Sequence, residues 1–186
     1  MQIGLEEARE RLKRKLAACI RTGKITLSSG KETDFYFDGR LVSLDPEGSV
    51  LIAVLMLDEL RKRGVEAVGG MTSGADPITS SIGVLAYQGG VPLRLFYIRK
   101  AAKEHGMKRQ VEGPPLPEGM RVALVDDVVT TGRAILDSRD ALLREARVEV
   151  SDALVVVDRE EGGREALERE GIAFTSLFRR RDFLPG

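Results

Sequence analysis

The sequence contains a single cysteine, Cys19, no tryptophan and one histidine. One thiol excludes an intrachain disulfide. The 29 acidic and 29 basic residues give a formal net charge of zero, so no overall field directs the chain towards nucleic acid or a membrane surface. The sequence also has neither a signal peptide nor an apolar run long enough to span a bilayer. We therefore expect a cytoplasmic protein that binds neither nucleic acid nor membrane.

The length of the chain favours one domain. Its 186 residues, of which 42% are hydrophobic, are typical of a single globular domain over 1–186. From residue 65 onward, short apolar runs alternate with stretches of helical spacing. The expected strands are 65–70, 93–98, 122–125, 150–157 and 172–178, and the expected helices are 77–87, 133–146 and 164–170. This alternation predicts an α/β fold with a parallel sheet of about five strands flanked by helices, in which ligands bind beyond the carboxyl ends of the strands.

The first 44 residues follow a different pattern and are expected to form a small lid on the core. Apolar residues recur at helical spacing from Leu5 to Ile20, and this helix is expected to end near Gly23. Two short strands, 25–27 and 34–40, should then form a hairpin.

The α/β core is expected over 45–186 and should open with a helix. Asp45 is a suitable N-cap, and Pro46 suits the first helical position. Gly64 is a plausible stop for this helix.

The most informative stretch is an apolar strand that ends in two acids and a small polar turn, Val122 to Gly132. Helical spacing begins directly afterwards, so the turn should carry a helix N-terminus. Exposed amides and the positive end of the helix dipole favour a phosphate there, and Thr130 and Thr131 add hydroxyl donors. Asp126 and Asp127 would repel that phosphate unless they face another part of the ligand, and the vicinal hydroxyls of a ribose meet this need. A strand end whose acids only cap the helix is the alternative.

Two further loops follow expected strands. Residues 69–77 are rich in glycine and other small residues, which fits either a close backbone approach to a ligand or a tight turn. The run from Arg99 to Arg109 carries five fixed positive charges against one negative charge. A loop of roughly twenty residues over 100–119 without its own structure is often mobile and functional. Because the rest of the chain balances its charge, we interpret this loop as a cationic lid over an anionic group.

The stretch from Asp126 to Gly132 resembles the phosphoribosyl diphosphate (PRPP) motif of the type I phosphoribosyltransferases. The stretch from Arg99 to Gly106 is similar to the Arg-Lys-x-x-Lys-x-His-Gly signature of the orotate phosphoribosyltransferases, and residues 1–44 resemble the N-terminal hood of that family. No nucleoside triphosphate P-loop motif occurs. The resemblance implies the type I phosphoribosyltransferase fold and transfer of a phosphoribosyl group from PRPP to N1 of orotate. The products would be orotidine 5′-monophosphate and diphosphate, as in de novo pyrimidine biosynthesis.

The resemblance also implies roles for individual residues. Lys103 and Asp127 would be catalytic. The PRPP-binding residues would be Arg99, Lys100, Lys103, His105, Asp126, Asp127, Val128, Val129, Thr130, Thr131, Gly132, Arg133 and Ala134. Thr130 and Arg159 would bind orotate, the arginine through the carboxylate of the substrate. A surface arginine in a charged turn is the alternative for Arg159.

Parts of the family pattern are absent. Ser28 aligns with a lysine of many bacterial members, and Thr72-Ser73 stand where those members have a Tyr-Lys pair. We therefore do not expect these phosphate and base contacts here. Tyr36 and Phe37 are either the aromatic pair that lies near orotate in the family or part of the hairpin core.

The resemblance implies a cofactor and a partner as well. Mg²⁺ is expected on the diphosphate and ribose oxygens of PRPP, without a direct protein ligand. The chain is expected to form a homodimer in which the cationic loop of one subunit closes over the site of the other. A phosphoribosyltransferase for another base and a nucleotide- and RNA-binding regulator of the same fold are the alternatives. The regulator would need a basic face outside the site, and Arg179 to Arg181 is a weak candidate.

Overall fold

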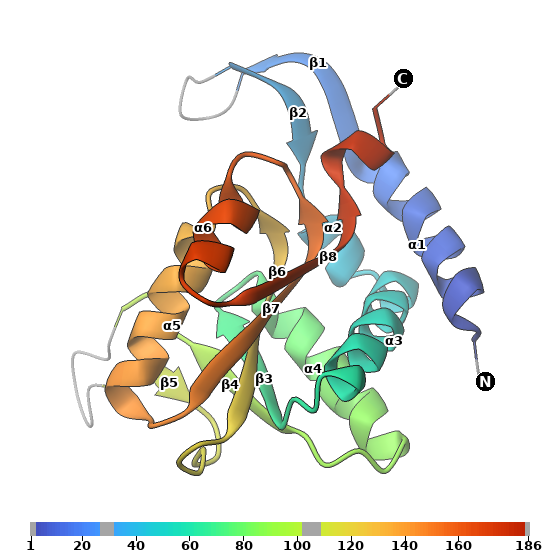
Figure 1. Ribbon diagram of the computed structural model, residues 1–186. Coiled ribbons are helices and arrows are strands. Elements are labelled where there is room, and N and C mark those ends of the chain that lie inside the picture. Colours follow the sequence, from blue (N-terminus) through green and yellow to red (C-terminus); the bar gives the residue numbers. More distant parts are fainter. Residues whose placement is uncertain (1–2, 27–31, 102–108, 185–186) are drawn as a thin grey trace.

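The computed structural model describes residues 3–26, 32–101 and 109–184. Its centre is a six-stranded sheet in the order β5-β4-β3-β6-β7-β8 (Figure 1). The strands are β3 (Ala67–Met71), β4 (Arg94–Ile98), β5 (Val111–Glu112), β6 (Arg121–Val129), β7 (Glu149–Asp158) and β8 (Ala173–Arg179). Within the described residues β5 pairs antiparallel with β4 at the sheet edge, and the other strands run parallel. The predicted α/β fold with about five parallel strands is confirmed, and β5 is an additional strand.

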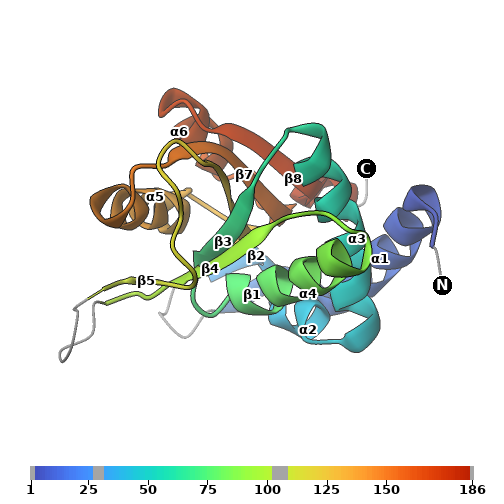
Figure 2. The ribbon, with the colours of Figure 1, turned by 90° about the horizontal axis from the view of Figure 1, so that it is seen from below.

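Helices cover both faces of this sheet (Figure 2). One face carries α1 (Leu5–Cys19), α3 (Pro46–Lys62) and α4 (Ala75–Gln88), and the other carries α5 (Arg133–Glu145) and α6 (Gly163–Arg169). Successive side chains of β6 point alternately to the two faces of the sheet. Ala123 and Val125 join the cluster under α3 and α4, whereas Val122 and Leu124 join the cluster under α5. A strand buried on both faces reads as a continuous apolar run, which is why the sequence signal for β6 is clear.

Local signals set both ends of α3. The side chain of Asp45 accepts a hydrogen bond of 2.7 Å from the backbone N–H of Gly48, and Pro46 occupies the first turn. Gly64, with φ of 65°, follows the end of the helix. The predicted start and stop are confirmed.

The N-terminal helix and hairpin are also present, but at different limits. The hairpin consists of β1 (Ile20–Thr26) and β2 (Glu32–Phe37), which pair antiparallel, and residues 27–31 lie outside the described residues. The helix α1 ends at Cys19, because Ile20 already pairs with Phe37. The predicted end near Gly23 is therefore wrong. Gly23, with φ of 101°, instead lies in β1 at a shift of the strand register, a position that favours glycine.

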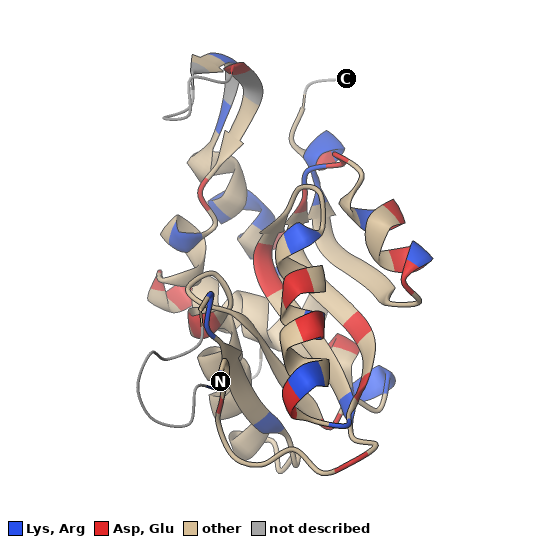
Figure 3. Ribbon diagram, turned by 90° about the vertical axis from the view of Figure 1, so that its left-hand side faces the viewer, with Lys and Arg blue, Asp and Glu red and all other residues tan. Residues whose placement is uncertain are grey.

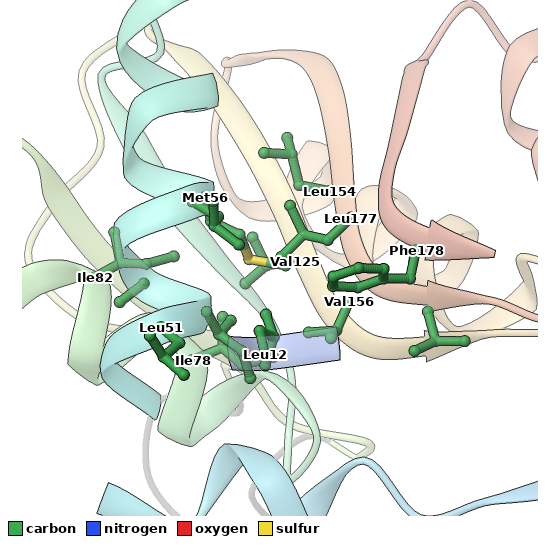
Figure 4. Close-up of a cluster of buried hydrophobic side chains, with 14 of the residues drawn as sticks. Leu12, Leu51, Met56, Ile78, Ile82, Val125, Leu154, Val156, Leu177 and Phe178 are labelled. Atoms are coloured by element: carbon green, nitrogen blue, oxygen red, sulfur yellow. The ribbon is translucent and has the colours of Figure 1, made fainter. Parts of the chain in front are cut away.

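The second strand of the hairpin is shorter than predicted. It ends at Phe37 rather than at Arg40, because the chain turns at Gly39 into the short helix α2 (Arg40–Ser43). Figure 4 shows that the N-terminal segment and the core meet in one apolar cluster, to which α1 contributes Leu12 and α3 contributes Met56. The division at residue 45 remains a prediction.

The stretch over 100–119 is not entirely without structure, contrary to the prediction. Val111 pairs with Ile98 of β4, and its backbone N–H donates a hydrogen bond of 3.2 Å to the Glu145 carboxylate. Leu116 packs against the apolar cluster under α5. The second half of the stretch is thus fastened to the sheet edge, while residues 102–108 lie outside the described residues.

Basic and acidic positions lie close together along the chain in one view of the ribbon (Figure 3). Figure 3 shows basic and acidic positions interspersed along the helices. Within the described residues, the structure contains no helix with the length and apolar character needed to cross a membrane.

Candidate functional site

The candidate site lies at the carboxyl end of β6. The strand was expected to end at Val125, but it continues through Val129, since Asp126 pairs with Val155 and Val128 with Val157 of β7. The two acids therefore lie in the last part of the strand rather than in the turn that follows. Pairing with β7 fixes the backbone of both acids.

Two glycines from outside β6 pack directly against this acidic pair. A Cβ atom added at Gly39 would lie 2.5 Å from Oδ2 and 2.7 Å from Cγ of Asp127. A Cβ atom added at Gly74 would clash with Oδ1 of Asp126 and lie 3.0 Å from Oδ1 of Asp127. Gly39 precedes α2 and Gly74 precedes α4, so two distant segments enclose the carboxylates.

Burial determines the electrostatics of the pair. Removal from water raises the pKa of Asp126 well above its ordinary value, the charge of Asp127 raises this pKa further, and the charge of Lys100 opposes the shift. Burial is also the largest cause that raises the pKa of Asp127. The backbone N–H of Asp127 donates a hydrogen bond of 2.9 Å to Oδ1 of Asp126. Hydroxyl donors or a cation on a ligand would stabilise the charged form of these buried carboxylates.

The turn after β6 forms a cavity of about 350 Å³. The cavity is lined by Asp126, Val128, Val129, Thr130, Thr131, Gly132, Arg133, Ala134, Ile135 and Asp137. Gly132, with φ of 80°, precedes α5, whose first amides and dipole favour an anion. The structure thus joins one acid of the pair and the whole predicted PRPP turn in a single cavity. A ribose phosphate matches this cavity, because its hydroxyls can donate to the carboxylate and its phosphate can accept from the amides of the turn.

The basic stretch before β5 is only partly described. Lys100 and Arg133 line a neighbouring cavity of about 450 Å³. Arg99 is largely exposed, and its guanidinium lies 3.8 Å from the Glu112 carboxylate. Lys103 and His105 fall within 102–108, outside the described residues, so their roles remain predictions.

Arg159 follows β7 and lies beside the end of β6. Its backbone N–H donates a hydrogen bond of 3.0 Å to the carbonyl of Val129. Its guanidinium donates from Nη2 to the carbonyl of Phe35, at 3.3 Å, and forms an ion pair of 2.8 Å with Glu161. The side chain is 16% exposed and thus only partly open to solvent, and its role in orotate binding stays a prediction.

The loop after β7 packs on the turn after β6. A Cβ atom added at Gly163 would lie 2.6 Å from the carbonyl oxygen of Thr130 and 3.1 Å from the backbone nitrogen of Gly132. Only a residue without a side chain permits this contact. The two predicted orotate ligands, Thr130 and Arg159, are therefore carried by adjoining loops.

The remaining predicted positions fall around this centre. Ser73 lines a separate cavity of about 320 Å³, together with Arg40 and Asp76. Phe37 is buried in the apolar core cluster, whereas Tyr36 is only partly buried. Phe37 therefore packs in the apolar core beneath the hairpin.

The C-terminal arginines make contacts within the chain, and Arg179 and Arg181 are exposed. The Arg181 guanidinium pairs with Glu160. The Arg180 guanidinium lies 5.6 Å from the centre of the Phe35 ring, and the backbone N–H of Arg179 donates a hydrogen bond of 2.7 Å to Asp182. Nothing in these contacts favours an RNA-binding surface.

Comparison with known proteins identifies the class. Residues 47–172 match the model of the phosphoribosyl transferase domain. The matched region contains β6, the acidic pair, the turn and Arg159. The fold and the site thus define a phosphoribosyltransferase.

Individual relatives narrow this class. The chain is 46% identical over 158 residues to an orotate phosphoribosyltransferase of Aquifex aeolicus (strain VF5), which covers 85% of both chains. It is 39% identical over 165 residues to one of Bradyrhizobium sp. (strain ORS 278), covering 87% of this chain and 89% of the relative. The Mycobacterium tuberculosis H37Rv enzyme in complex with PRPP matches with a TM-score of 0.79 and 32% identity, covering 95% of this chain and 98% of that one. The chain belongs to the orotate phosphoribosyltransferase family.

Proposed function

We propose that this protein transfers the phosphoribosyl group of PRPP to N1 of orotate, forming orotidine 5′-monophosphate and diphosphate. The C1′–O bond to diphosphate breaks and its electron pair leaves with the diphosphate. The N1–C1′ bond forms from the N1 lone pair of orotate, and the N1 proton is released to solvent. The observation that carries this proposal is the cavity that places Asp126 beside the amides of residues 131–134, because a ribose phosphate matches that combination of groups.

The acidic pair would act on the ribose. Cleavage of a bond to an anomeric carbon passes through an oxocarbenium-like state, in which positive charge grows on the sugar. Asp127 and Asp126 accept hydrogen bonds from the ribose hydroxyls and stabilise that charge. Enclosure by Gly39 and Gly74 holds the carboxylates in place before substrate arrives, so little reorganisation is needed during the reaction.

Cationic side chains would act on the leaving group. Negative charge grows on the diphosphate as the C1′–O bond breaks, and Arg99, Lys100, Lys103 and His105 are assigned to its stabilisation. Support for this assignment comes from Lys100, whose charge acts on Asp126 and which lines the cavity beside the PRPP turn. Lys103 is assigned as the catalytic cation.

Mg²⁺ would neutralise part of the diphosphate charge when PRPP is bound. The acidic pair suits a site near such a cation. Burial raises the pKa of both carboxylates, and a nearby positive charge would offset the cost of ionising them. Among the described residues, no group of three or more His, Cys, Asp or Glu side chains is arranged to hold a metal. We assign the ion to the oxygens of the substrate rather than to protein ligands, because Mg²⁺ retains waters and prefers substrate phosphates.

We further propose a homodimer with shared sites, located in the cytoplasm. Ile98 of β4 precedes the cationic stretch in sequence and pairs with Val111 of β5, which follows it, so both flanks of the stretch are at the sheet edge. A closed two-fold pair would let each stretch reach the site of the partner.

An acceptor panel tests the proposed activity. Purified protein is incubated with PRPP, Mg²⁺ and one of orotate, uracil, hypoxanthine or adenine, and nucleotide products are separated by chromatography. We expect orotidine 5′-monophosphate and no comparable product from the other three bases, because only orotate has a carboxylate for Arg159. A faster reaction with a base that lacks the carboxylate would overturn the assignment and favour a phosphoribosyltransferase for another base.

A further inference from the structure

The loop from Arg159 to Gly162 is held by contacts that none of the proposed substrate roles requires. Glu160 has φ of 57°, which is uncommon for a residue other than glycine. Its carboxylate pairs with the Arg181 guanidinium and accepts a hydrogen bond of 3.1 Å from the Arg181 backbone N–H. Its own backbone N–H donates a hydrogen bond of 2.8 Å to Asp158. These contacts fix the turn immediately before Glu161.

The fixed turn directs Glu161 back onto Arg159. Oε1 of Glu161 lies 2.8 Å from Nη2 of Arg159, the same nitrogen that donates to the carbonyl of Phe35. The arginine side chain is 16% exposed and that of the glutamate is 38% exposed, so Glu161 is the outer member of the pair. It can leave towards solvent without disturbing the packing of the arginine.

We propose that Glu161 is a specificity-determining residue that occupies Arg159 in the absence of substrate and must be displaced by a substrate carboxylate. This inference rests on the proposed function, in which Arg159 binds the carboxylate of orotate. Glu161 contacts Nη2 of Arg159, so a substrate carboxylate that binds the guanidinium through Nη2 must take its place. An ion pair with a solvent-exposed member is weak, so a well-placed bidentate carboxylate replaces it.

The competition also explains discrimination against neutral bases. A base without a carboxylate cannot replace Glu161 at Arg159. The ion pair between Arg159 and Glu161 therefore persists, and the base gains no binding energy from Arg159. In the free protein, Glu161 supplies an anionic partner for this partly buried guanidinium. Selection against other bases thus comes from an internal competitor as well as from attraction to the correct substrate.

The test is Glu161→Gln, which keeps the side-chain shape and removes the charge. Glu165→Gln is the matched control, because Glu165 is an exposed residue of the neighbouring helix and loses the same charge. We expect Glu161→Gln to lower the orotate KM about two- to fivefold, the range expected for a weak ion pair, with kcat and the PRPP KM unchanged. Equilibrium titration should show a similarly lower orotate Kd. Glu165→Gln should leave both constants at wild-type values.

Two results would overturn the inference. An orotate Kd in Glu161→Gln equal to that in Glu165→Gln would mean that Glu161 does not compete. A weaker Kd would mean that Glu161 holds Arg159 in its productive position, which is a supporting role rather than competition. Failure of the proposed function is a separate result, namely no orotidine 5′-monophosphate from the wild-type protein, because the titration does not depend on turnover.

Discussion

The enclosure of the acidic pair makes Gly39→Ala an informative perturbation. Gly39 has φ of −60° and ψ of −25°, so alanine adopts this backbone conformation without strain. The nearest obstacle is Asp127, because the added Cβ would lie 2.5 Å from its Oδ2 and 2.6 Å from its Cβ, whereas ordinary contacts begin at 3.4 Å. Because Cβ of Asp127 moves only with the strand backbone, a new rotamer cannot relieve the contact. The backbone at Gly39 or Asp127 must shift by about 0.9 Å, the difference between 3.4 and 2.5 Å.

A displacement of this size should reduce catalysis more than stability. Misplacement of a reacting group by about 1 Å can lower the rate about 100-fold. We therefore expect kcat to fall by one to two orders of magnitude, with a smaller change in the PRPP KM. Asp127→Asn, which removes the charge and keeps the shape, should show the same pattern. Steady-state kinetics with orotate and PRPP measure both constants, and Gly4→Ala is the control, because its added Cβ meets nothing within 4 Å.

The combined variant decides whether Gly39 acts through Asp127. If it does, adding Gly39→Ala to Asp127→Asn should lower kcat by no more than about twofold beyond Asp127→Asn alone, since the interaction has already been lost. Losses that multiply in the double variant would refute the reasoning. An unchanged kcat in Gly39→Ala would refute it equally.

The remaining predictions concern the base, the pH dependence and the assembly. Arg159→Ala should raise the orotate KM about 10- to 150-fold, corresponding to roughly 1.5–3 kcal/mol for a lost charged hydrogen bond, with PRPP binding nearly intact; a KM within twofold of wild type would exclude the contact. Because burial raises the pKa of Asp126, the folded state holds this proton more tightly than the unfolded chain, and stability falls as pH rises from the unfolded pKa through the folded pKa. Asp126→Asn should therefore have a higher Tm than wild type at pH 7, an advantage that shrinks as pH falls towards 4, and a constant difference across this range would contradict the burial argument. Mixing inactive Lys103→Ala and Asp127→Asn homodimers should restore about a quarter of wild-type activity per site, because half of the random pairs are mixed and each has one intact site; no recovery after confirmed subunit exchange would place both residues in one chain's site.

The parts of the fold that were predictable depend on local chemistry. The N-cap of α3 at Asp45 and the turn after β6 are set by residues adjacent in sequence, and both were predicted. The end of α1 was misplaced, because pairing of Ile20 with Phe37 outweighs the stop signal at Gly23. The continuation of β6 through its acids was missed for the same reason, since pairing with β7 decides it.

Sequence reasoning also missed residues that act across distance. Gly74 was noted only as part of a small-residue loop, and Gly39 carried no signal at all, because its role depends on the approach of α2 to β6. Glu161 read as an ordinary acid in a charged turn. Glu161 contacts Arg159 in a turn that is held by the contact between Glu160 and Arg181. Arg181 follows β8 and is distant in sequence, so no local pattern predicts this contact.

PRPP should bind with its phosphate on the turn after β6 and its ribose on the acidic pair. A crystal structure of the protein with PRPP and Mg²⁺ tests this most directly. We expect the 5-phosphate on the backbone amides of residues 131–134 and the ribose hydroxyls within hydrogen-bond distance of Asp126 and Asp127. A ribose turned away from both carboxylates, or a 5-phosphate bound elsewhere on the chain, would contradict it.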